Sequence, residues 1–405
     1  MKLNVNSAIK IPKIHIVYVW IMLFFAFSGF YYAKIPVLSP VYIVFIPTFL
    51  IILLFLVIKK CISLNISCLF GAAFVFYIFF SQFLVGGKII AIFGSMVTVL
   101  YFILSTILLP LLTKPQIYKI LNYFLCTNVL IYGFDTIYRL SLYHFNLNAM
   151  LTSFYLMKKQ CLFYSDTNPL AINTTILTFF SFYLFDKNKE LKYLIFMLIF
   201  VILTYLTLSR SGIIAIIASF VIYFLYRNVK TILKNKNSIK LTAVPLKLIF
   251  LCIFLVIISI IGFFLSNLIV NYLSADGSFS TKISLLKGLK NFFHNAPFST
   301  ILFGTGYNNG QIMIYTGLSY AHSYLATYVI ETGLCGYLLM TSFLVSIVLH
   351  TPKTLFIFIP FIFLGISHIS HAQLHVFYSV LALVAALESF VEINNKIDVN
   401  NIKEV

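Results

Sequence analysis

The sequence predicts an all-α fold, a polytopic membrane protein with about twelve transmembrane helices in a single domain over residues 1–405. Of the 405 residues, 61% are hydrophobic and only 9% are charged, whereas soluble domains are about half apolar and a quarter charged. The apolar residues fall in runs long enough to cross a bilayer, and most Lys and Arg residues lie between the runs.

Apolar runs of spanning length follow one another along most of the chain. The first, from Ile14 to Ala33, is expected to be an uncleaved signal anchor. The predicted spans are 14–33, 37–58, 61–84, 89–112, 117–137, 169–186, 191–208, 210–226, 247–270, 323–349, 354–370 and 374–391.

The basic residues predict the orientation of these spans. With the N-terminus in the cytoplasm, about two thirds of the 28 Lys and Arg residues lie on the cytoplasmic side, as the positive-inside rule requires. Both termini are then inside. The two long connections, 138–168 and 271–322, are extracytoplasmic, and the main cytoplasmic connection is 227–246. Because long loops carry function more often than short ones, we expect the chemistry outside.

Several classes of function do not fit this pattern. The net charge of +18 is explained by topology signals and contact with anionic membrane lipids, so we expect no nucleic-acid partner. No Gly-rich ATP loop occurs in a cytoplasmic segment, which argues against a nucleotide-driven pump. No cysteine pair has zinc-site spacing, and no cofactor is expected. His368, His371 and His375 could bind zinc on one helix face, but a predicted turn there favours a polar lining of the outer cavity.

The first informative polar feature is Asp166-Thr167-Asn168-Pro169, at the end of the first long loop. Asn168 or Thr167 before Pro169 indicates a helix start, with Pro169 at the first helical position. This segment is either a capped helix entering the membrane or a helix end whose N–H groups, with Asn168, bind an anion.

The second feature is Thr207-Leu208-Ser209-Arg210-Ser211-Gly212, a predicted outer turn between two spans. Arg210 falls in the first turn of the second helix, where a cation opposes the helix dipole. Arginine suits bidentate phosphate binding, and Ser209, Ser211 and Gly212 let a ligand approach the backbone. An arginine that extends to the membrane interface is the alternative, but it leaves the flanking serines unexplained.

The third feature lies in the second long loop. Lys282, Lys287 and Lys290 lie on an amphipathic stretch, Thr281 to Phe293, which is typical of a helix on the membrane surface. The segment Phe303-Gly304-Thr305-Gly306-Tyr307-Asn308-Asn309-Gly310 follows. It is rich in turn residues, and we expect exposed amides beside Tyr307, groups that often hold sugars. No strand precedes it, so it is not a dinucleotide fingerprint.

The fourth feature is His322 with Ser323 and Tyr324, at the start of the tenth span. His322 can exchange a proton near neutral pH. Glu331 lies about 13.5 Å deeper on the same helix, so it does not pair with His322 directly. A carboxylate within the membrane is a functional candidate, although it could equally form a structural hydrogen bond to a neighbouring helix.

In this order, the features resemble the O-antigen polymerase (Wzy) and O-antigen ligase superfamily. The order is Asn-Pro at residues 168–169, Ser-Arg-Ser-Gly at 209–212, Gly-Thr-Gly-Tyr at 304–307, His-Ser-Tyr-Leu at 322–325 and Glu-Thr-Gly at 331–333. The similarity covers about Asp166 to Gly336. It implies catalytic roles for Arg210 and His322. It also implies a second basic residue in the first long loop, for which Arg139, Lys158 and Lys159 are the candidates.

The resemblance implies a metal- and nucleotide-independent glycosyltransferase of the bacterial inner (cytoplasmic) membrane. A polymerase of O-antigen or capsule transfers a glycan from undecaprenyl diphosphate to a lipid-linked repeat unit, with a chain-length regulator and a flippase as partners. Two alternatives stay open. One is a ligase that transfers the glycan to lipid A–core, and the other is a flippase for lipid-linked oligosaccharides. Charge and loop length gathered on one face favour an enzyme over a flippase.

Overall fold

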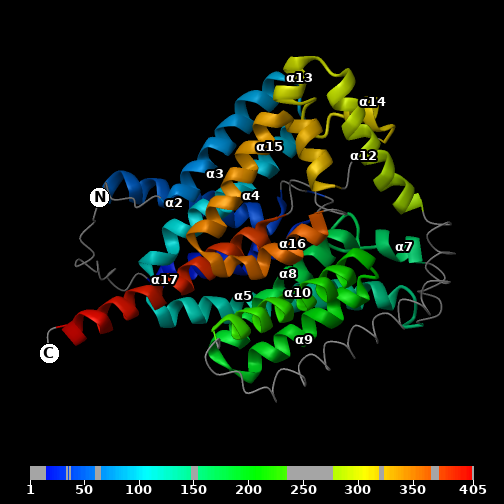
Figure 1. Ribbon diagram of the computed structural model, residues 1–405. Coiled ribbons are helices and arrows are strands. Elements are labelled where there is room, and N and C mark those ends of the chain that lie inside the picture. Colours follow the sequence, from blue (N-terminus) through cyan, green and yellow to red (C-terminus); the bar gives the residue numbers. More distant parts are fainter. Residues whose placement is uncertain are drawn as a thin grey trace.

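The computed structural model describes residues 15–32, 35, 38–59, 65–146, 154–234, 277–318, 323–365 and 374–403 (Figure 1). All regular secondary structure in these ranges is helical. The elements are α1 (His15–Ala26), η1 (Phe27–Gly29), α2 (Pro40–Lys59), α3 (Ile66–Tyr77), η3 (Ile78–Gln82), α4 (Ile89–Leu108), η4 (Leu109–Leu111), α5 (Lys114–Ser141), α7 (Phe154–Lys159), α8 (Thr167–Asn188), α9 (Leu191–Leu206), α10 (Arg210–Lys234), α12 (Gly277–Asn295), α13 (Phe298–Phe303), α14 (Ile312–Thr316), α15 (Tyr324–His350), η5 (Pro352–Thr354), α16 (Leu355–Gly365) and α17 (His375–Lys403).

The helices follow the apolar runs of the sequence. Each predicted span coincides with a described helix except 247–270, which lies outside the described residues. Among the described residues, four helices are long and apolar enough to cross a bilayer, namely Ile89–Leu111, Lys114–Ser141, Arg210–Arg227 and Ala326–His350. The chain is therefore an all-helical membrane protein, while the count of twelve spans and their orientation stay predictions.

Local signals in the sequence set several helix ends. The side chain of Asn65 accepts a hydrogen bond from Cys68 N at the start of α3 (2.8 Å). At the start of α5, Thr113 and Gln116 form a capping box. Lys189 ends α8 in the left-handed conformation, with φ 59°. Such caps supply partners to backbone groups that the helix itself leaves unpaired, which matters most where no water is present.

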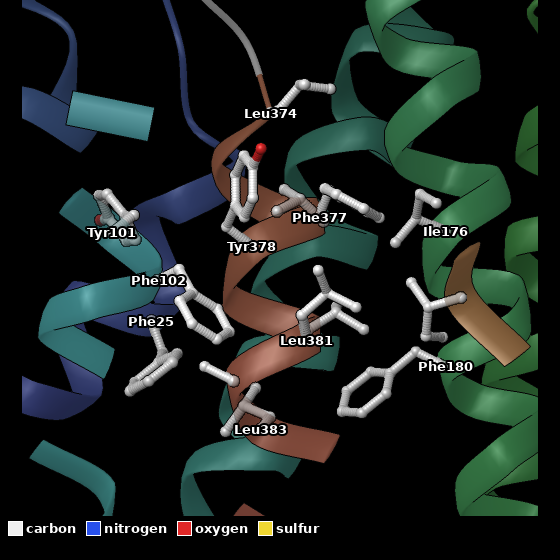
Figure 2. Close-up of a cluster of buried hydrophobic side chains, with 14 of the residues drawn as sticks. Phe25, Tyr101, Phe102, Ile176, Phe180, Leu374, Phe377, Tyr378, Leu381 and Leu383 are labelled. Atoms are coloured by element: carbon white, nitrogen blue, oxygen red, sulfur yellow. The ribbon is translucent and has the colours of Figure 1, made fainter. Parts of the chain in front are cut away.

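The centre of the bundle is α17, packed between α4 and α8 (Figure 2). Phe377 and Leu381 of α17 are fully buried, as are Phe25 of α1 and Phe180 of α8, and Phe102 of α4 is 1% exposed. Apolar side chains on the outside of the bundle remain exposed, such as Leu84 at 82%. Apolar residues both inside and outside are what a lipid-facing bundle requires.

The two ends of the bundle carry different polar groups. At one end, here called the Arg210 end, α5 and α9 finish and α8 and α10 begin. At the other end, here called the Lys187 end, α8 finishes beside α17. There Lys187 Nζ lies 2.8 Å from Glu388 Oε1, and Tyr183 donates to the same carboxylate. The helices α12, α13 and α14 lie together beyond the outer part of α15 (Figure 1).

Candidate functional site at the Arg210 end

The turn between α9 and α10 has the form that the sequence predicts, since α10 begins at Arg210. Leu208 adopts a left-handed conformation with φ 55°, which reverses the chain. Ser209 is fully buried, its N–H donates to Thr207 Oγ1 (3.1 Å), and its hydroxyl lies 3.1 Å from that of Ser211. Arg210 is partly buried in the first turn of the helix.

The start of α8 differs slightly from the prediction. The helix begins at Thr167, with Asp166 as its N-cap, so Pro169 is the third helical residue rather than the first. The Asp166 carboxylate accepts a hydrogen bond from Asn168 N (2.8 Å), and this cap outcompetes Thr167 and Asn168 for the role. Asn168 Oδ1 and the Thr167 hydroxyl are buried and have no hydrogen-bond partner among the described residues.

These two helix starts lie side by side. Gly212, in the first turn of α10, is so close to its neighbours that a methyl group there would contact Thr204 of α9 and Ala171 of α8. Thr204 donates to Thr174 Oγ1 of α8 (2.8 Å). The positive ends of two helix dipoles and the Arg210 side chain therefore share one end of the bundle, an arrangement that favours an anion.

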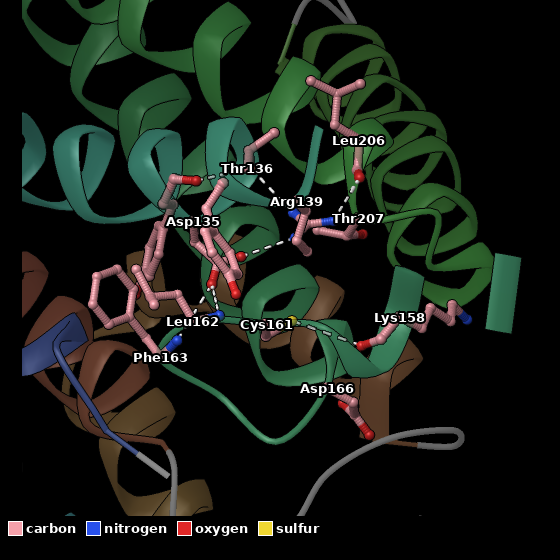
Figure 3. Close-up of polar contacts among 12 residues, drawn as sticks. Asp135, Thr136, Arg139, Lys158, Cys161, Leu162, Phe163, Asp166, Leu206 and Thr207 are labelled. Atoms are coloured by element: carbon pink, nitrogen blue, oxygen red, sulfur yellow. Dashed lines mark hydrogen bonds and ion pairs between the residues drawn. The ribbon is translucent and has the colours of Figure 1, made fainter. Parts of the chain in front are cut away.

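Arg139, predicted in a loop as a possible phosphate ligand, lies instead in the last turns of α5 and is fully buried (Figure 3). Its Nε lies 2.9 Å from Asp135 Oδ2. Its Nη2 donates to Thr136 Oγ1 and its Nη1 to the carbonyl of Leu206, both at 3.1 Å. The guanidinium is engaged with the protein, so we no longer assign Arg139 to substrate binding.

Asp135 is the residue that sequence reasoning missed. Besides Arg139, its carboxylate accepts hydrogen bonds from Leu162 N (2.8 Å) and Phe163 N (3.4 Å), in the connection between α7 and α8 (Figure 3). Asp135 and Arg139 are four residues apart, the i, i+4 spacing of an ion pair on a helix, and this spacing could have identified Asp135 from the sequence.

The other basic candidates of the first long loop lie in α7. Lys158 is partly buried and Lys159 is exposed. In Figure 3 the Lys158 side chain extends away from Arg139. Cys161, which follows this helix, is buried. The structure thus places the α10 turn with Ser209, Arg210 and Ser211 beside the first turns of α8, which carry Asn168, and it puts Lys158 and Lys159 on a separate helix.

The Gly-Thr-Gly-Tyr and Glu-Thr-Gly segments meet each other. Helix α15 is interrupted at Gly333, with φ 71° and ψ 178°. The carbonyls of Ile330 and Glu331 accept hydrogen bonds from Thr305 N (2.9 Å) and Gly306 N (3.0 Å) instead of from the next helical turn. We call this contact between the 304–307 loop and the interrupted helix the loop–helix clasp. Glu331 itself is buried, 5% exposed.

Tyr307 completes the loop–helix clasp from the other side. Its N–H donates to Gln82 Oε1 (2.8 Å), its carbonyl accepts from Lys88 N (2.8 Å), and its hydroxyl lies 3.3 Å from Ser95 Oγ. The ring is fully buried. The expectation of exposed amides is therefore wrong for residues 304–307, because their polar groups bond to η3, α4 and α15, while Asn308 and Gly310 are exposed. We withdraw Tyr307 as a sugar contact.

Tyr324 lines an apolar groove between α12, α15 and α16. The groove encloses about 700 Å³ and extends from Ser323 and Gly365 to Leu349 and Leu355. Most of its lining is aliphatic or aromatic. The Tyr324 ring packs on Phe361 of α16, and its buried hydroxyl has no hydrogen-bond partner in the described part of the chain.

His322 lies outside the described residues, as do His368 and His371. His375 is fully buried rather than lining an open cavity. Its ring packs edge-on against Tyr42 and Tyr101, and its Nε2 lies 3.5 Å from Thr98 Oγ1. Within the described ranges, no group of three His, Cys, Asp or Glu side chains is placed to hold a metal ion.

No family model matches this chain, and no curated protein sequence matches it significantly. The similarity to the O-antigen polymerase and ligase superfamily therefore rests on the order of motifs along the sequence. What the geometry adds is that the start of α8, which carries Asn168, and the start of α10, which carries Arg210, lie side by side although they are about forty positions apart in the chain.

Proposed function

We propose that this protein is a polysaccharide repeat-unit polymerase of the bacterial inner membrane. In this proposal it transfers a glycan from undecaprenyl diphosphate to a lipid-linked repeat unit at the outer face of the membrane, for O-antigen or capsule. The observation that supports the proposal is the side-by-side packing of the first turns of α8 and α10, which carry Asn168 and Arg210.

The chemistry of the donor explains why such a site is sufficient. Diphosphate is a good leaving group, so the enzyme has to stabilise its negative charge as the glycosidic bond breaks. Arg210 can supply a bidentate cation, and the two helix N-termini supply backbone N–H groups and favourable dipoles. His322, adjacent to Ser323 at the start of α15, would orient or deprotonate the acceptor hydroxyl. No nucleotide is needed because the donor bond already stores the energy.

The apolar groove supports a substrate with a long hydrocarbon chain. Its lining runs from Tyr324 and Gly365 at one end to Leu349 and Leu355 at the other, so it follows α16 over its whole length. That length is about 16 Å, roughly half the thickness of a bilayer core. Helix α16 packs on α10 with one face and lines the groove with another. A lipid chain in this groove would therefore end one helix away from the turn that carries Arg210.

The test is the surface glycan of a deletion strain complemented with Arg210→Ala or His322→Ala, with each protein quantified in the membrane. We expect deletion to leave one-repeat glycan, and each variant to lower polymer formation by about 100-fold or more, the loss typical of removing one charge-stabilising group. Arg227→Ala and His350→Ala are matched controls, because they change the same residue types at the opposite ends of α10 and α15.

The other outcomes of this experiment identify the alternatives. Accumulation of lipid-linked polymer in the deletion strain, with none on lipid A–core, would indicate the ligase. Retention of the unprocessed repeat on the cytoplasmic side would indicate the flippase. A full ladder with both Arg210→Ala and His322→Ala would refute the site.

A further inference from the structure

The buried ion pair between Asp135 and Arg139 holds both segments that form the candidate site. Arg139 Nη1 donates to the carbonyl of Leu206, the last residue of α9, just before the turn that carries Arg210. Asp135 Oδ1 accepts the N–H of Leu162, in the connection that leads to α8. We propose that Asp135 and Arg139 are positioning residues, which fix the Arg210 turn relative to the start of α8.

The contacts of the pair fit positioning better than ligand binding. Both side chains are fully buried, and both oxygens of Asp135 and all three nitrogens of Arg139 have a hydrogen-bond partner within the protein. A buried ion pair adds little stability compared with apolar residues of the same volume. A planar guanidinium, however, fixes three partners in set directions, which a flexible ammonium does not.

The position of the Leu206 carbonyl explains how the ion pair can fix the place of Arg210. The last carbonyls of a helix have no partner within that helix. Arg139 supplies one to Leu206, and this fixes the place where α9 ends and where Leu208 turns the chain. The first turn of α10, from Arg210 to Gly212, follows directly, and Gly212 lies against Ala171 and Thr175 of α8. A shift of the α9 end therefore displaces this turn relative to α8.

Cys161 reports on the same contact without any assay of activity. It precedes Leu162 in the connection that Asp135 holds, and it is 6% exposed. Burial raises the pKa of the Cys161 thiol, and Asp135 adds to that effect, so little thiolate exists near neutral pH. In the native protein Cys161 should react slowly with a maleimide.

The experiment, which rests on the proposed function, compares Asp135→Leu/Arg139→Met and Arg139→Lys with wild type in membranes of the full chain. Measurements are the rate of Cys161 modification, read from the labelled peptide, and the kcat and KM for lipid-linked donor. Lys187→Met/Glu388→Leu removes an ion pair at the opposite end and is the matched control. Each variant is also combined with Arg210→Lys.

If the pair positions Arg210, Cys161 in the apolar double variant should react with the maleimide at least about tenfold faster than in the wild type. Its kcat falls by about 100-fold while KM changes by less than about threefold, the cost of a misplaced charge-stabilising group. In the Arg210→Lys background the same replacement costs less than about threefold, because Arg210 no longer acts from its fixed place. Arg139→Lys should lower kcat as much as the double variant does, because one ammonium group cannot bind the three partners of the Arg139 guanidinium at once.

Unchanged modification of Cys161, or equal losses of kcat in both backgrounds, would overturn the positioning role. Failure of the proposed function is distinguishable from this result. In that case a strain that carries Arg210→Ala alone would make a full glycan ladder, whatever the variants of the pair show.

Discussion

At the scale of single residues, the glycines at 304 and 333 show how closely two backbones approach. A methyl group on Gly304 would collide with the Glu331 carbonyl, and one on Gly333 would collide with that of Leu302. Both glycines also have positive φ, a region that other residues avoid. The loop–helix clasp therefore depends on the absence of two side chains.

Gly333→Ala should lower the midpoint of thermal unfolding in detergent more than Gly317→Ala does. Both glycines have φ near 70°, but no atom lies within 4 Å of a methyl group on Gly317. Gly317 has ψ 6°, the left-handed helical region, where a side chain costs about 1–2 kcal/mol. Gly333 has ψ 178°, a region essentially restricted to glycine, so its backbone strain is larger. The excess in Gly333→Ala combines this strain with the collision with Leu302, and equal midpoints would mean that the two backbones separate and relax without cost.

At the scale of elements, α3 continues into the π-helix η3, whose last residue, Gln82, is fully buried. The Gln82 side chain accepts from Tyr307 N (2.8 Å) and donates to the carbonyl of Phe303 (3.2 Å). One amide thus satisfies two backbone groups of the 303–307 segment. A π-turn in a membrane helix commonly marks a place where a side chain has to be redirected.

Gln82→Leu should destabilise the protein by about 1–3 kcal/mol for each backbone group left buried without a partner. We expect a lower unfolding midpoint and faster hydrogen exchange in residues 303–307, measured by mass spectrometry. Phe83→Leu, at a neighbouring side chain that is 66% exposed, is the control and should change neither. Unaltered exchange in Gln82→Leu would show that the contacts with Lys88, α4 and α15 hold the loop without Gln82.

Local sequence signals predicted the helix positions that depend only on residues close together in the chain. The start of α10 at Arg210 and the helix around Thr281–Phe293 follow from turn residues and from periodicity. The shift of the α8 start to Thr167 shows the limit of that reasoning, because three adjacent residues compete for the cap. Burial of Arg139 and Tyr307 depends on Leu206 and Gln82, which are distant in sequence and carry no local signal.

At the scale of the whole molecule, polar groups concentrate at the two ends of an apolar bundle. The predicted orientation places the Arg210 end outside and the Lys187 end in the cytoplasm. Asn146 follows α5, which finishes at the Arg210 end, whereas Lys189 follows α8, which finishes at the Lys187 end. Which end faces outward is a question for experiment.

Fusions of alkaline phosphatase and of green fluorescent protein decide the orientation. We expect phosphatase activity after Asn146 and Asn295, and fluorescence after Lys189 and Thr351, because phosphatase folds only outside and fluorescence develops only inside. Immunoblots of both series control for expression. The reverse pattern would place Arg210 in the cytoplasm, where lipid-linked repeat units are not polymerised, and would contradict the proposed function.

The loop–helix clasp also sets a requirement on biosynthesis. Gln82 and its partner Tyr307 are 225 residues apart in the chain. At 5–20 residues per second, the ribosome needs about 10–45 s to synthesise the partner after Gln82 has been made. Through that interval a nascent α3–α4 hairpin holds an amide with neither of its later backbone partners. The insertion machinery therefore has to shelter an unfinished hairpin, and chains truncated before residue 303 become natural substrates for membrane proteases.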